Sequence, residues 1–262
     1  MTTEMQDHVA LVVGAGSGIG LACALAFAHA GADVVVAARR RQPVEDLARA
    51  VHQATGRRVV PIVCDIADVA AARNLVDRTV GELARLDAVV NVATASGGRA
   101  DVVDLDFDGY RQAFEVNVLG TLEVSRVAAR HMGLNGGGSI VQISTLGVHA
   151  RGEQQSIYTS TKAALVSASF TMAKEVGRHG VRVNIVTPGF TTGANLDRMF
   201  SQIADRTGRD VESVSARAAS TAALRRHVDP DDIAEAVLFL SSARARNVTG
   251  VELRVDAGQW TG

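Results

Sequence analysis

Tyr158 and Lys162 form the pattern Tyr-x-x-x-Lys, which can carry proton chemistry. A spacing of four residues places both side chains on one face of a helix. A phenol has an ordinary pKa of about 10, and a neighbouring ammonium group lowers that pKa because it stabilises the phenolate. We therefore expect Tyr158 to exchange a proton with a substrate oxygen. The pattern is short and also arises by chance, so other residues of the sequence must show whether it marks a catalytic site.

Two further polar residues could belong to the same site. Thr145 follows the apolar run 139–144, where its hydroxyl could polarise a substrate carbonyl or simply cap the end of a strand. Asn117 lies inside an apolar stretch of helical length, although asparagine is unfavourable in the interior of a helix. Asn117 therefore has a specific polar task, or it is a buried amide whose hydrogen bonds are satisfied within the core.

Strands and helices that alternate along the chain must position these residues. Seven short runs are apolar almost throughout, as in strands covered on both faces. These runs are His8–Val13, Asp33–Ala38, Val59–Val63, Asp87–Val90, Ser139–Ser144, Val181–Thr187 and Val251–Val255. The expected helices are Ile19–Ala30, Val44–Ala54, Val69–Leu83, Phe107–Met132, Ser156–His179 and Asp231–Leu240. This alternation predicts an α/β fold, a parallel sheet with helices on both sides.

One long segment, Phe190 to His227, contains no expected strand and follows Pro188-Gly189. It holds two weakly amphipathic pieces, 194–207 and 211–223. A segment of this length is either a lid over a site or an ordinary helical excursion. Its apolar residues offer a wall for a substrate or pack among themselves; they include Phe190, Leu196, Met199 and Phe200.

A glycine-rich loop follows the first expected strand. The residues Gly14-Ala15-Gly16-Ser17-Gly18-Ile19-Gly20 fit Gly-x-x-x-Gly-x-Gly and lead into a helix. Absent side chains let the backbone approach a pyrophosphate, whose charge then lies at the helix N-terminus. Glycine is common in any tight turn, but the position after the first strand of an α/β chain favours a dinucleotide.

The end of the second expected strand indicates which dinucleotide the protein binds. Folds that bind NAD commonly place an acid there for the ribose hydroxyls. Asp33 opens this strand, whereas the carboxyl end reads Arg39-Arg40-Arg41. Arg39 or Arg40 can pair with a 2′-phosphate through charge-assisted hydrogen bonds, or the arginines form a solvated basic turn. The missing acid favours NADP(H) over NAD(H).

Composition narrows the function classes. The 262 residues carry 27 basic and 28 acidic side chains without a long charge block, so nucleic-acid or membrane-surface binding has no electrostatic support. No apolar run approaches the ~18 residues of a spanning helix, and the N-terminal residues resemble no signal peptide. Cys23 and Cys64 fit two buried thiols in a reducing compartment, without a metal site. We expect a cytoplasmic protein with one domain, residues 1–262.

Together these motifs resemble the short-chain dehydrogenase/reductase family over essentially the whole chain. They occur in family order as Gly14-x-x-x-Gly18-x-Gly20, Asp65-Ile66, Asn117, Ser144-Thr145, Tyr158-x-x-x-Lys162, Pro188-Gly189 and Val255-Asp256-Ala257-Gly258. The resemblance implies a seven-stranded Rossmann sheet with a helical lid at about 190–227. It also implies hydride transfer between a nicotinamide and a small carbonyl compound or secondary alcohol, in a homo-oligomer of two or four subunits.

The resemblance implies residue roles as well. Tyr158 would be the acid/base, Lys162 would lower its pKa and hold the nicotinamide ribose, and Asn117 would support a proton-relay water. Thr145 takes the position of the catalytic serine. The implied cofactor-binding residues are Gly14, Ser17, Gly18, Ile19, Gly20, Arg39, Arg40, Asp65, Ile66, Asn91, Ala93, Tyr158, Lys162, Pro188, Gly189 and Thr191.

The sequence departs from the family pattern at several positions, and two of these departures bear on whether the protein is catalytic. Threonine replaces serine at 145, and the usual Asn-Asn-Ala-Gly turn reads Asn91-Val92-Ala93-Thr94. These changes motivate an alternative hypothesis, a cofactor-binding regulator or scaffold with vestigial catalysis. A dehalogenating branch of the fold, which uses no nucleotide, is disfavoured because the glycine loop and Lys162 are present.

Overall fold

Seven short strands form one parallel sheet in the computed structural model, which describes residues 4–261. Residues 1–3 of the N-terminal stretch and Gly262 therefore lie outside the described part of the chain. The strands are β1 (Val9–Val13), β2 (Asp33–Ala38), β3 (Val59–Val63), β4 (Ala88–Asn91), β5 (Gly138–Ile143), β6 (Val181–Pro188) and β7 (Glu252–Val255). Each observed end lies within one residue of its prediction. The order is β3-β2-β1-β4-β5-β6-β7, so the order reverses between β1 and β4.

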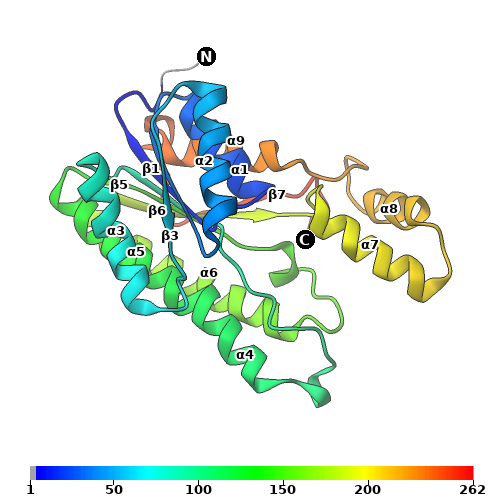
Figure 1. Cartoon of the computed structure of the whole chain (residues 1–262). Coiled ribbons are helices and arrows are strands. Elements are labelled where there is room, and N and C mark those ends of the chain that lie inside the picture. Colours follow the sequence, from blue (N-terminus) through cyan, green and yellow to red (C-terminus); the bar gives the residue numbers. More distant parts are fainter. Residues whose placement is uncertain (1–3, 262) are drawn as a thin grey trace.

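Helices cover both faces of the sheet, as Figure 1 shows. One face carries α1 (Ile19–His29), α2 (Arg41–Thr55) and α9 (Pro230–Ser241), and the other carries α3 (Val69–Leu83), α5 (Thr121–Leu134) and α6 (Ser156–Val176). Neighbouring strand residues enter different cores: Val12 packs in the first and Leu11 in the second. Side chains alternate along a strand, so apolar runs bury both faces. The predicted α/β Rossmann class is confirmed.

The expected helix Phe107–Met132 is present and contains a π-helical turn. It begins as α4 (Phe107–Phe114), continues as a π-helical segment η2 (Glu115–Gly120), and resumes as α5. A π-helical turn holds one extra residue, and such turns are frequent at functional sites. The predicted helix is therefore confirmed, but hydrophobic periodicity does not register the inserted residue. Asn117 lies within η2.

Two other predicted helix ends needed correction. The helix α2 begins at Arg41, three residues before the prediction, because Pro43 lies in the first turn, where its missing N–H has no intrahelical partner to lose. The last expected residues of α6 form a separate 3₁₀ turn, η4 (Gly177–His179), before the left-handed Gly180. No helix among residues 4–261 is long and apolar enough to cross a membrane.

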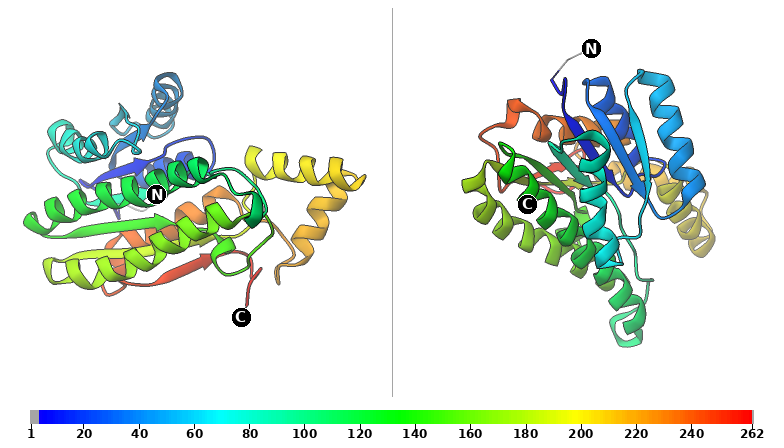
Figure 2. Two further views of the ribbon diagram at one scale, coloured as in Figure 1. Left: turned by 90° about the horizontal axis from the view of Figure 1, so that it is seen from below. Right: turned by 60° about the vertical axis from the view of Figure 1, so that its left-hand side comes forward.

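The segment after β6 forms two helices, α7 (Ala194–Thr207) and α8 (Val211–Ser220), which we call the lid. The lid projects beyond the end of the sheet, as Figure 1 and the left view of Figure 2 show. Its apolar residues form a cluster of their own, with Leu196, Phe200, Ala204 and Val214 buried. Both helices were predicted, although α8 ends three residues early.

Candidate active site

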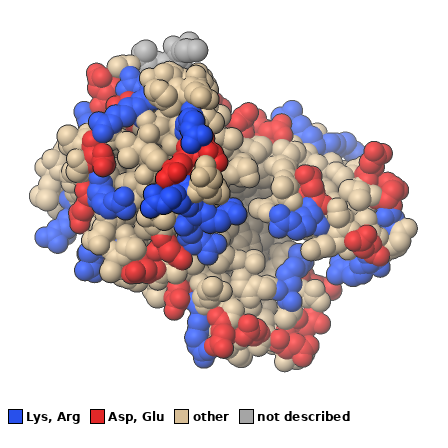
Figure 3. Space-filling model, viewed as in Figure 1, with Lys and Arg blue, Asp and Glu red and all other residues tan. Residues whose placement is uncertain are grey.

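The main cleft opens at the carboxyl ends of the strands. Its volume is about 1360 Å³, and its walls come from the segments after β1 to β6 together with the lid. Reversal of strand order between β1 and β4 leaves their following loops on opposite sides, and open parallel sheets bind ligands in this crevice. Figure 3 shows the hollow between the sheet domain and the lid, with basic side chains at its rim.

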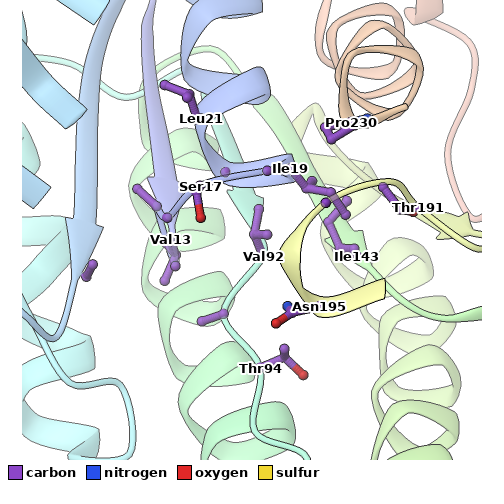
Figure 4. A pocket seen from close by; sticks show the side chains of 18 of the residues that line it. Val13, Ser17, Ile19, Leu21, Val92, Thr94, Ile143, Thr191, Asn195 and Pro230 are labelled. Carbon is purple, nitrogen blue, oxygen red and sulfur yellow. The ribbon is translucent and has the colours of Figure 1, made fainter. Parts of the chain in front are cut away.

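The glycine loop forms one wall of the cleft and leaves room for an anion. Gly14 has φ +86°, and a Cβ there would collide with the backbone of Ala93. No atom lies within 4 Å of the positions that a Cβ would take at Gly16 and Gly18. Figure 4 shows the Ser17 and Ile19 side chains beside this opening. The loop therefore brings bare backbone to the edge of the cleft.

The N-terminus of α1 complements the loop electrostatically. Gly18 caps the helix without a side-chain hydrogen bond, and its first turn holds no acidic residue. The first N–H groups of a helix lack intrahelical partners and carry the positive end of the helix dipole. A pyrophosphate fits this arrangement because it supplies both the acceptors and the negative charge.

Only two of the three consecutive arginines line the cleft. Arg39 and Arg40 do so, and among residues 4–261 neither forms an ion pair. Arg41 instead pairs with Glu45 one turn along α2, at 3.1 Å. Asp33 lies at the opposite end of β2, where it pairs with Arg57 at 2.8 Å. Two free guanidinium groups, and no acid from β2, therefore face the region next to the glycine loop.

The far part of this wall follows β3. Asp65 and Ile66 line the cleft as predicted, and Asp65 Oδ1 accepts a hydrogen bond of 3.1 Å from the backbone N–H of Ala67. Pro43 and Leu47 of α2 line it as well, and sequence reasoning missed them. Their signal would have been the amphipathic face of α2, whose apolar side turns partly toward the cleft.

Tyr158 and Lys162 lie in the first turns of α6 and face the same cleft. The Lys162 side chain is 2% exposed, and its Nζ donates a hydrogen bond of 2.8 Å to the carbonyl oxygen of Ile143 at the end of β5. Burial lowers the pKa of Lys162 to about 8. The end of β5 thus fixes the ammonium group in the cleft that Tyr158 also lines.

The Tyr158 phenol differs from the expectation in its proton affinity. Burial raises the pKa of Tyr158, while hydrogen bonding with the side chains of Thr94 and Thr145 lowers it. The predicted fall of this pKa next to Lys162 is not what the structure gives, because loss of hydration outweighs the local polar contacts. The phenol therefore holds its proton at neutral pH.

Thr145 has the capping role, one of the two alternatives that the sequence left open, and it also lines the cleft. Its Oγ1 accepts a hydrogen bond of 3.3 Å from the N–H of Gly147, and so caps the short helix η3 (Leu146–Val148). The same side chain lines the cleft beside Tyr158. Ser144 is 3% exposed and its Oγ has no hydrogen-bond partner within the described chain.

Asn117 lies behind the cleft wall and not on it. Its Oδ1 accepts a hydrogen bond of 2.8 Å from the N–H of Ala95, and its Nδ2 donates to the Ala95 carbonyl at 2.8 Å and to Thr161 Oγ1 at 2.9 Å. Thr161 Oγ1 in turn donates to the Tyr158 carbonyl at 2.9 Å. Asn117 therefore joins the segment after β4 to the helix that carries Tyr158.

One predicted cofactor residue lies away from the cleft. Asn91 is 1% exposed, and its Nδ2 donates to Ser125 Oγ at 3.0 Å and to Gln142 Oε1 at 2.9 Å. It has the same strand parity as Val89, so it points toward α5. Ala93 lines the cleft, and so do Pro188, Gly189 and Thr191 after β6.

The lid supplies the remaining wall. Phe190, Leu196 and Met199 line the cleft as their apolar character suggested, but Phe200 is 3% exposed inside the lid cluster and does not. Asn195 and Arg198 also line it, and sequence reasoning missed both. Their signal is only that they lie near the start of a helix that follows Pro188-Gly189.

Comparison with known proteins identifies this arrangement. A family model described as enoyl-(acyl carrier protein) reductase matches residues 14–259. The short-chain reductase protein NovJ of Streptomyces niveus is 35% identical over 262 residues, which cover 98% of this chain and 97% of NovJ.

Solved structures agree in fold. L-sorbose reductase from Gluconobacter frateurii, complexed with NADPH and L-sorbose, superposes with a TM-score of 0.93 at 27% identity and covers 100% of both chains. A NAD⁺-bound xylitol dehydrogenase superposes with a TM-score of 0.91 at 26% identity, covering 97% of this chain and 99% of that one. The protein thus belongs to the short-chain dehydrogenase/reductase family of oxidoreductases, as its motifs indicated.

Proposed function

We propose that this protein is an NADP(H)-dependent oxidoreductase that interconverts a small or medium apolar carbonyl compound and a secondary alcohol. One observation carries the proposal: the phenol of Tyr158 and the ammonium group of Lys162 face the same cleft as the anion-binding glycine loop. A proton donor and a dinucleotide site in one cleft are what carbonyl reduction by hydride transfer requires.

The cofactor assignment rests on the wall between the glycine loop and α2. The N-terminus of α1 would hold the pyrophosphate, and Arg39 and Arg40 would pair with a 2′-phosphate. Among the structural relatives, the sorbose reductase holds NADPH and the xylitol dehydrogenase holds NAD⁺, so both choices occur on this fold. The two unpaired arginines favour NADP(H) here.

Three residues of the cleft have separate roles in the proposed proton transfer. A bound nicotinamide supplies or accepts the hydride at the carbonyl carbon. In reduction, the O–H bond of Tyr158 breaks and its proton goes to the substrate oxygen, which becomes a hydroxyl. Because burial raises the pKa of Tyr158, its phenol is protonated and ready to donate at neutral pH. Thr145 orients the carbonyl through its hydroxyl, and charged Lys162 stabilises the phenolate that remains.

The surroundings of the site suggest further properties. The apolar lid residues favour a small-molecule substrate with an apolar body over a highly charged one. Phe107, Leu119 and Phe170 are exposed apolar residues on α4, η2 and α6, which supports a homo-oligomer, a dimer or tetramer, with these helices at an interface. We also propose a single domain over residues 1–262 and a cytoplasmic location.

Titration with NADPH and with NADH, followed by nicotinamide fluorescence, tests the cofactor assignment. We expect tighter NADPH binding, and we expect Arg39→Ala or Arg40→Ala to weaken it by about ten- to a hundredfold, the value of a charge-assisted hydrogen bond. NADH binding should hardly change. Arg41→Ala is the matched control because Arg41 pairs with Glu45 away from the cleft. Equal binding of the two nucleotides by the wild type would contradict the assignment.

Turnover distinguishes the enzyme from the regulator or scaffold alternative. Tyr158→Phe should retain NADPH binding and lose carbonyl reduction across a panel of small ketones and aldehydes, measured as NADPH consumption. Retained turnover in this variant would overturn the proposed mechanism. The altered turn Asn91–Thr94 and Thr145 motivate the alternative, whereas the intact pair of Tyr158 and Lys162 in the cleft counts against it.

A further inference from the structure

The turn that follows β7, residues 256–260, places an aromatic ring against the segment that follows β5. The indole of Trp260 stacks on the imidazole of His149, with ring centroids 4.6 Å apart and an angle of 16° between the planes. The guanidinium group of Arg254 also lies over the indole, 4.5 Å from the ring centroid. Trp260 is half-buried and thus joins β7 to the segment after β5.

His149 ends the short helix η3, which begins directly after Thr145. Oγ1 of Thr145 accepts the N–H of Gly147 at 3.3 Å, and its carbonyl accepts the N–H of Val148 at 3.1 Å. The N–H of His149 donates to the Leu146 carbonyl at 2.9 Å and completes the turn. The direction of the Thr145 hydroxyl therefore depends on one helical turn, whose far end is His149.

The imidazole of His149 has one further support. Its Nε2 lies 2.7 Å from Oε1 of Glu252 in β7, and the fully buried Thr187 donates a hydrogen bond of 2.5 Å to the same oxygen. A single hydrogen bond restrains one atom of a ring, whereas a stacked partner restrains its plane. The indole of Trp260 is therefore what fixes the orientation of His149.

The turn after β7 is held by hydrogen bonds of its own. The buried carboxylate of Asp256 accepts the N–H of Gly258 at 2.9 Å and the N–H of Trp260 at 3.2 Å. The Asp256 carbonyl accepts the N–H of Gln259 at 3.0 Å. These bonds close a tight turn in which Ala257 and Gly258 have φ of +54° and +73°. Trp260 therefore projects from a well-defined base.

The neighbouring side chain of this turn contacts the other wall of the cleft. Gln259 Oε1 accepts a hydrogen bond of 3.2 Å from the N–H of Phe190, which lines the cleft where the chain leaves β6 for the lid. A Cβ at Gly189 would lie 3.1 Å from the same oxygen, so the two segments are in close contact. Adjacent residues of one turn thus serve different walls: Gln259 contacts the lid wall, and Trp260 contacts the segment that carries Thr145.

We propose that Trp260 is a positioning residue: by stacking on His149 it fixes η3, and through η3 it directs the Thr145 hydroxyl toward the substrate oxygen. The inference rests on the proposed function, which gives Thr145 the task of orienting the carbonyl. Trp260 itself lies outside the lining of the cleft, so it acts without touching the substrate or the nucleotide. Gln259 provides the contrast because it holds a residue of the substrate wall.

Trp260→Leu tests the inference because it removes the aromatic ring and keeps an apolar side chain. With the ketone that the wild type reduces fastest, we expect kcat to fall on the order of tenfold, since a small displacement of a catalytic group can cost up to about a hundredfold. KM and the Kd for NADPH should change less than about threefold. Trp260→Phe should restore most of the rate, because a phenyl ring can also stack on His149.

Gln259→Leu is the matched comparison within the same turn. It removes the acceptor of the Phe190 N–H, so we expect KM to rise about three- to tenfold, the value of one hydrogen bond, while kcat stays near that of the wild type. Gln259→Glu keeps an acceptor oxygen and should restore KM. A turn that served stability alone would give the leucine variants at 259 and 260 the same changes in KM and kcat, which would overturn the inference.

A double variant shows whether Trp260 acts through Thr145. In a Thr145→Ala background there is no hydroxyl to direct, so adding Trp260→Leu should lower kcat less than about twofold. A further tenfold loss would contradict the inference. If Thr145→Ala leaves no measurable rate, His149→Leu takes its place, and the pair with Trp260→Leu should be no slower than either single variant. His149→Leu leaves Glu252 its hydrogen bond from Thr187.

The outcomes separate the two proposals. If Tyr158→Phe is inactive while Trp260→Leu keeps the wild-type kcat, the role of Trp260 is wrong and the proposed function stands. A Trp260→Leu variant that loses NADPH affinity as much as kcat also overturns that role, because the nucleotide wall would then have moved. If Trp260→Leu does not fold, His149→Leu replaces it, and a wild-type kcat in that variant overturns the inference. Turnover by Tyr158→Phe overturns the proposed function itself.

Discussion

The two walls of the cleft are built in different ways. On the sheet side, Lys162 and Asn117 are buried. Lys162 is hydrogen-bonded to the backbone of Ile143, the last residue of β5, and Asn117 to the backbone of Ala95 in the segment after β4. The lid side has its own apolar cluster within α7 and α8. Outside the lid, Thr192 Oγ1 donates a hydrogen bond of 2.6 Å to Oδ1 of Asp229, so the segments before α7 and before α9 are joined.

This difference separates the chemistry from substrate selection. A side chain fixed to the end of a central strand moves only if the sheet moves, so the proton-transfer geometry is preorganised. A helical pair with a separate small core can tilt or open locally without disturbing the sheet. Substitutions should therefore act on kcat when they fall on the sheet wall and on KM when they fall in the lid.

Lys162→Met should show the largest effect. Loss of the ammonium group removes the charge that stabilises the phenolate, so we expect kcat to fall by about 10² to 10⁴, the range typical of acid/base machinery. Assays over a substrate series provide the measurement. A variant that changes KM with kcat preserved would break the proposed division between the walls.

The Lys162→Met variant also tests how the stability of the fold depends on pH. The pKa of Lys162 falls to about 8 in the folded protein and is about 10.4 in an unfolded chain. Between these values the unfolded state binds more protons, so wild-type stability gains from this group as pH rises from about 8 to about 10.4. Below pH 8 the buried charge lowers the free energy of unfolding by an amount that does not change with pH. Denaturant titrations should show this gain in the wild type and not in Lys162→Met.

The sequence predicted the sheet wall better than the lid, for physical reasons. Apolar runs and the loop Gly14–Gly20 reflect strong local constraints, namely two buried faces and a backbone that must approach a ligand. Tyr158 and Lys162 share a face because helix geometry requires it. The inward direction of Asn91 follows from strand parity with Val89, which was available in the sequence but was outweighed by the family motif.

Other features of the site had no local signature. The π-helical turn around Asn117 leaves no sign in the sequence, because one inserted residue does not change composition. In the sequence Thr94 indicates only a missing glycine, whereas the structure shows that its hydroxyl is hydrogen-bonded to Asn117. In the lid, Phe200 and Met199 are adjacent apolar residues, yet only Met199 lines the cleft. Helix rotation decides between them, and it is set by tertiary contacts.

Phe200→Ala should have an effect of intermediate size, and it tests the difference between the lid wall and the sheet wall. Phe200 packs in the lid cluster, so its truncation should loosen the substrate wall and raise KM on the order of tenfold, with kcat little changed. Global unfolding should hardly shift because that cluster is separate from the sheet cores. Phe27→Ala is the matched control: Phe27 is fully buried in the core of α1, and its loss should cost about 3–5 kcal/mol of unfolding free energy. Equal destabilisation by both variants would show that the lid and the sheet domain unfold together.

Glu123→Gln should have the smallest effect and should concern only the sheet side. Glu123 joins α3 to α5 by accepting hydrogen bonds from Arg73 at 2.9 Å and Arg126 at 2.8 Å. Hydrogen bonding with Arg126, and then with Arg73, lowers the pKa of Glu123 to about 2 despite the opposing effect of burial. A carboxylate with a lowered pKa stabilises the fold above its ordinary value near 4.5 and loses that contribution as pH falls toward 2.

Acid unfolding can therefore test whether loss of this contact destabilises the sheet side at low pH. The wild type should lose on the order of 1 kcal/mol between about pH 4.5 and 2 that Glu123→Gln does not lose, since both arginines are half exposed and screened. Glu45→Gln, which breaks an exposed ion pair within α2, should follow the wild type. Parallel acid profiles for the wild type and Glu123→Gln would mean that the α3–α5 contact does not limit stability, and that the acid-sensitive step lies elsewhere in the sheet domain or in the lid.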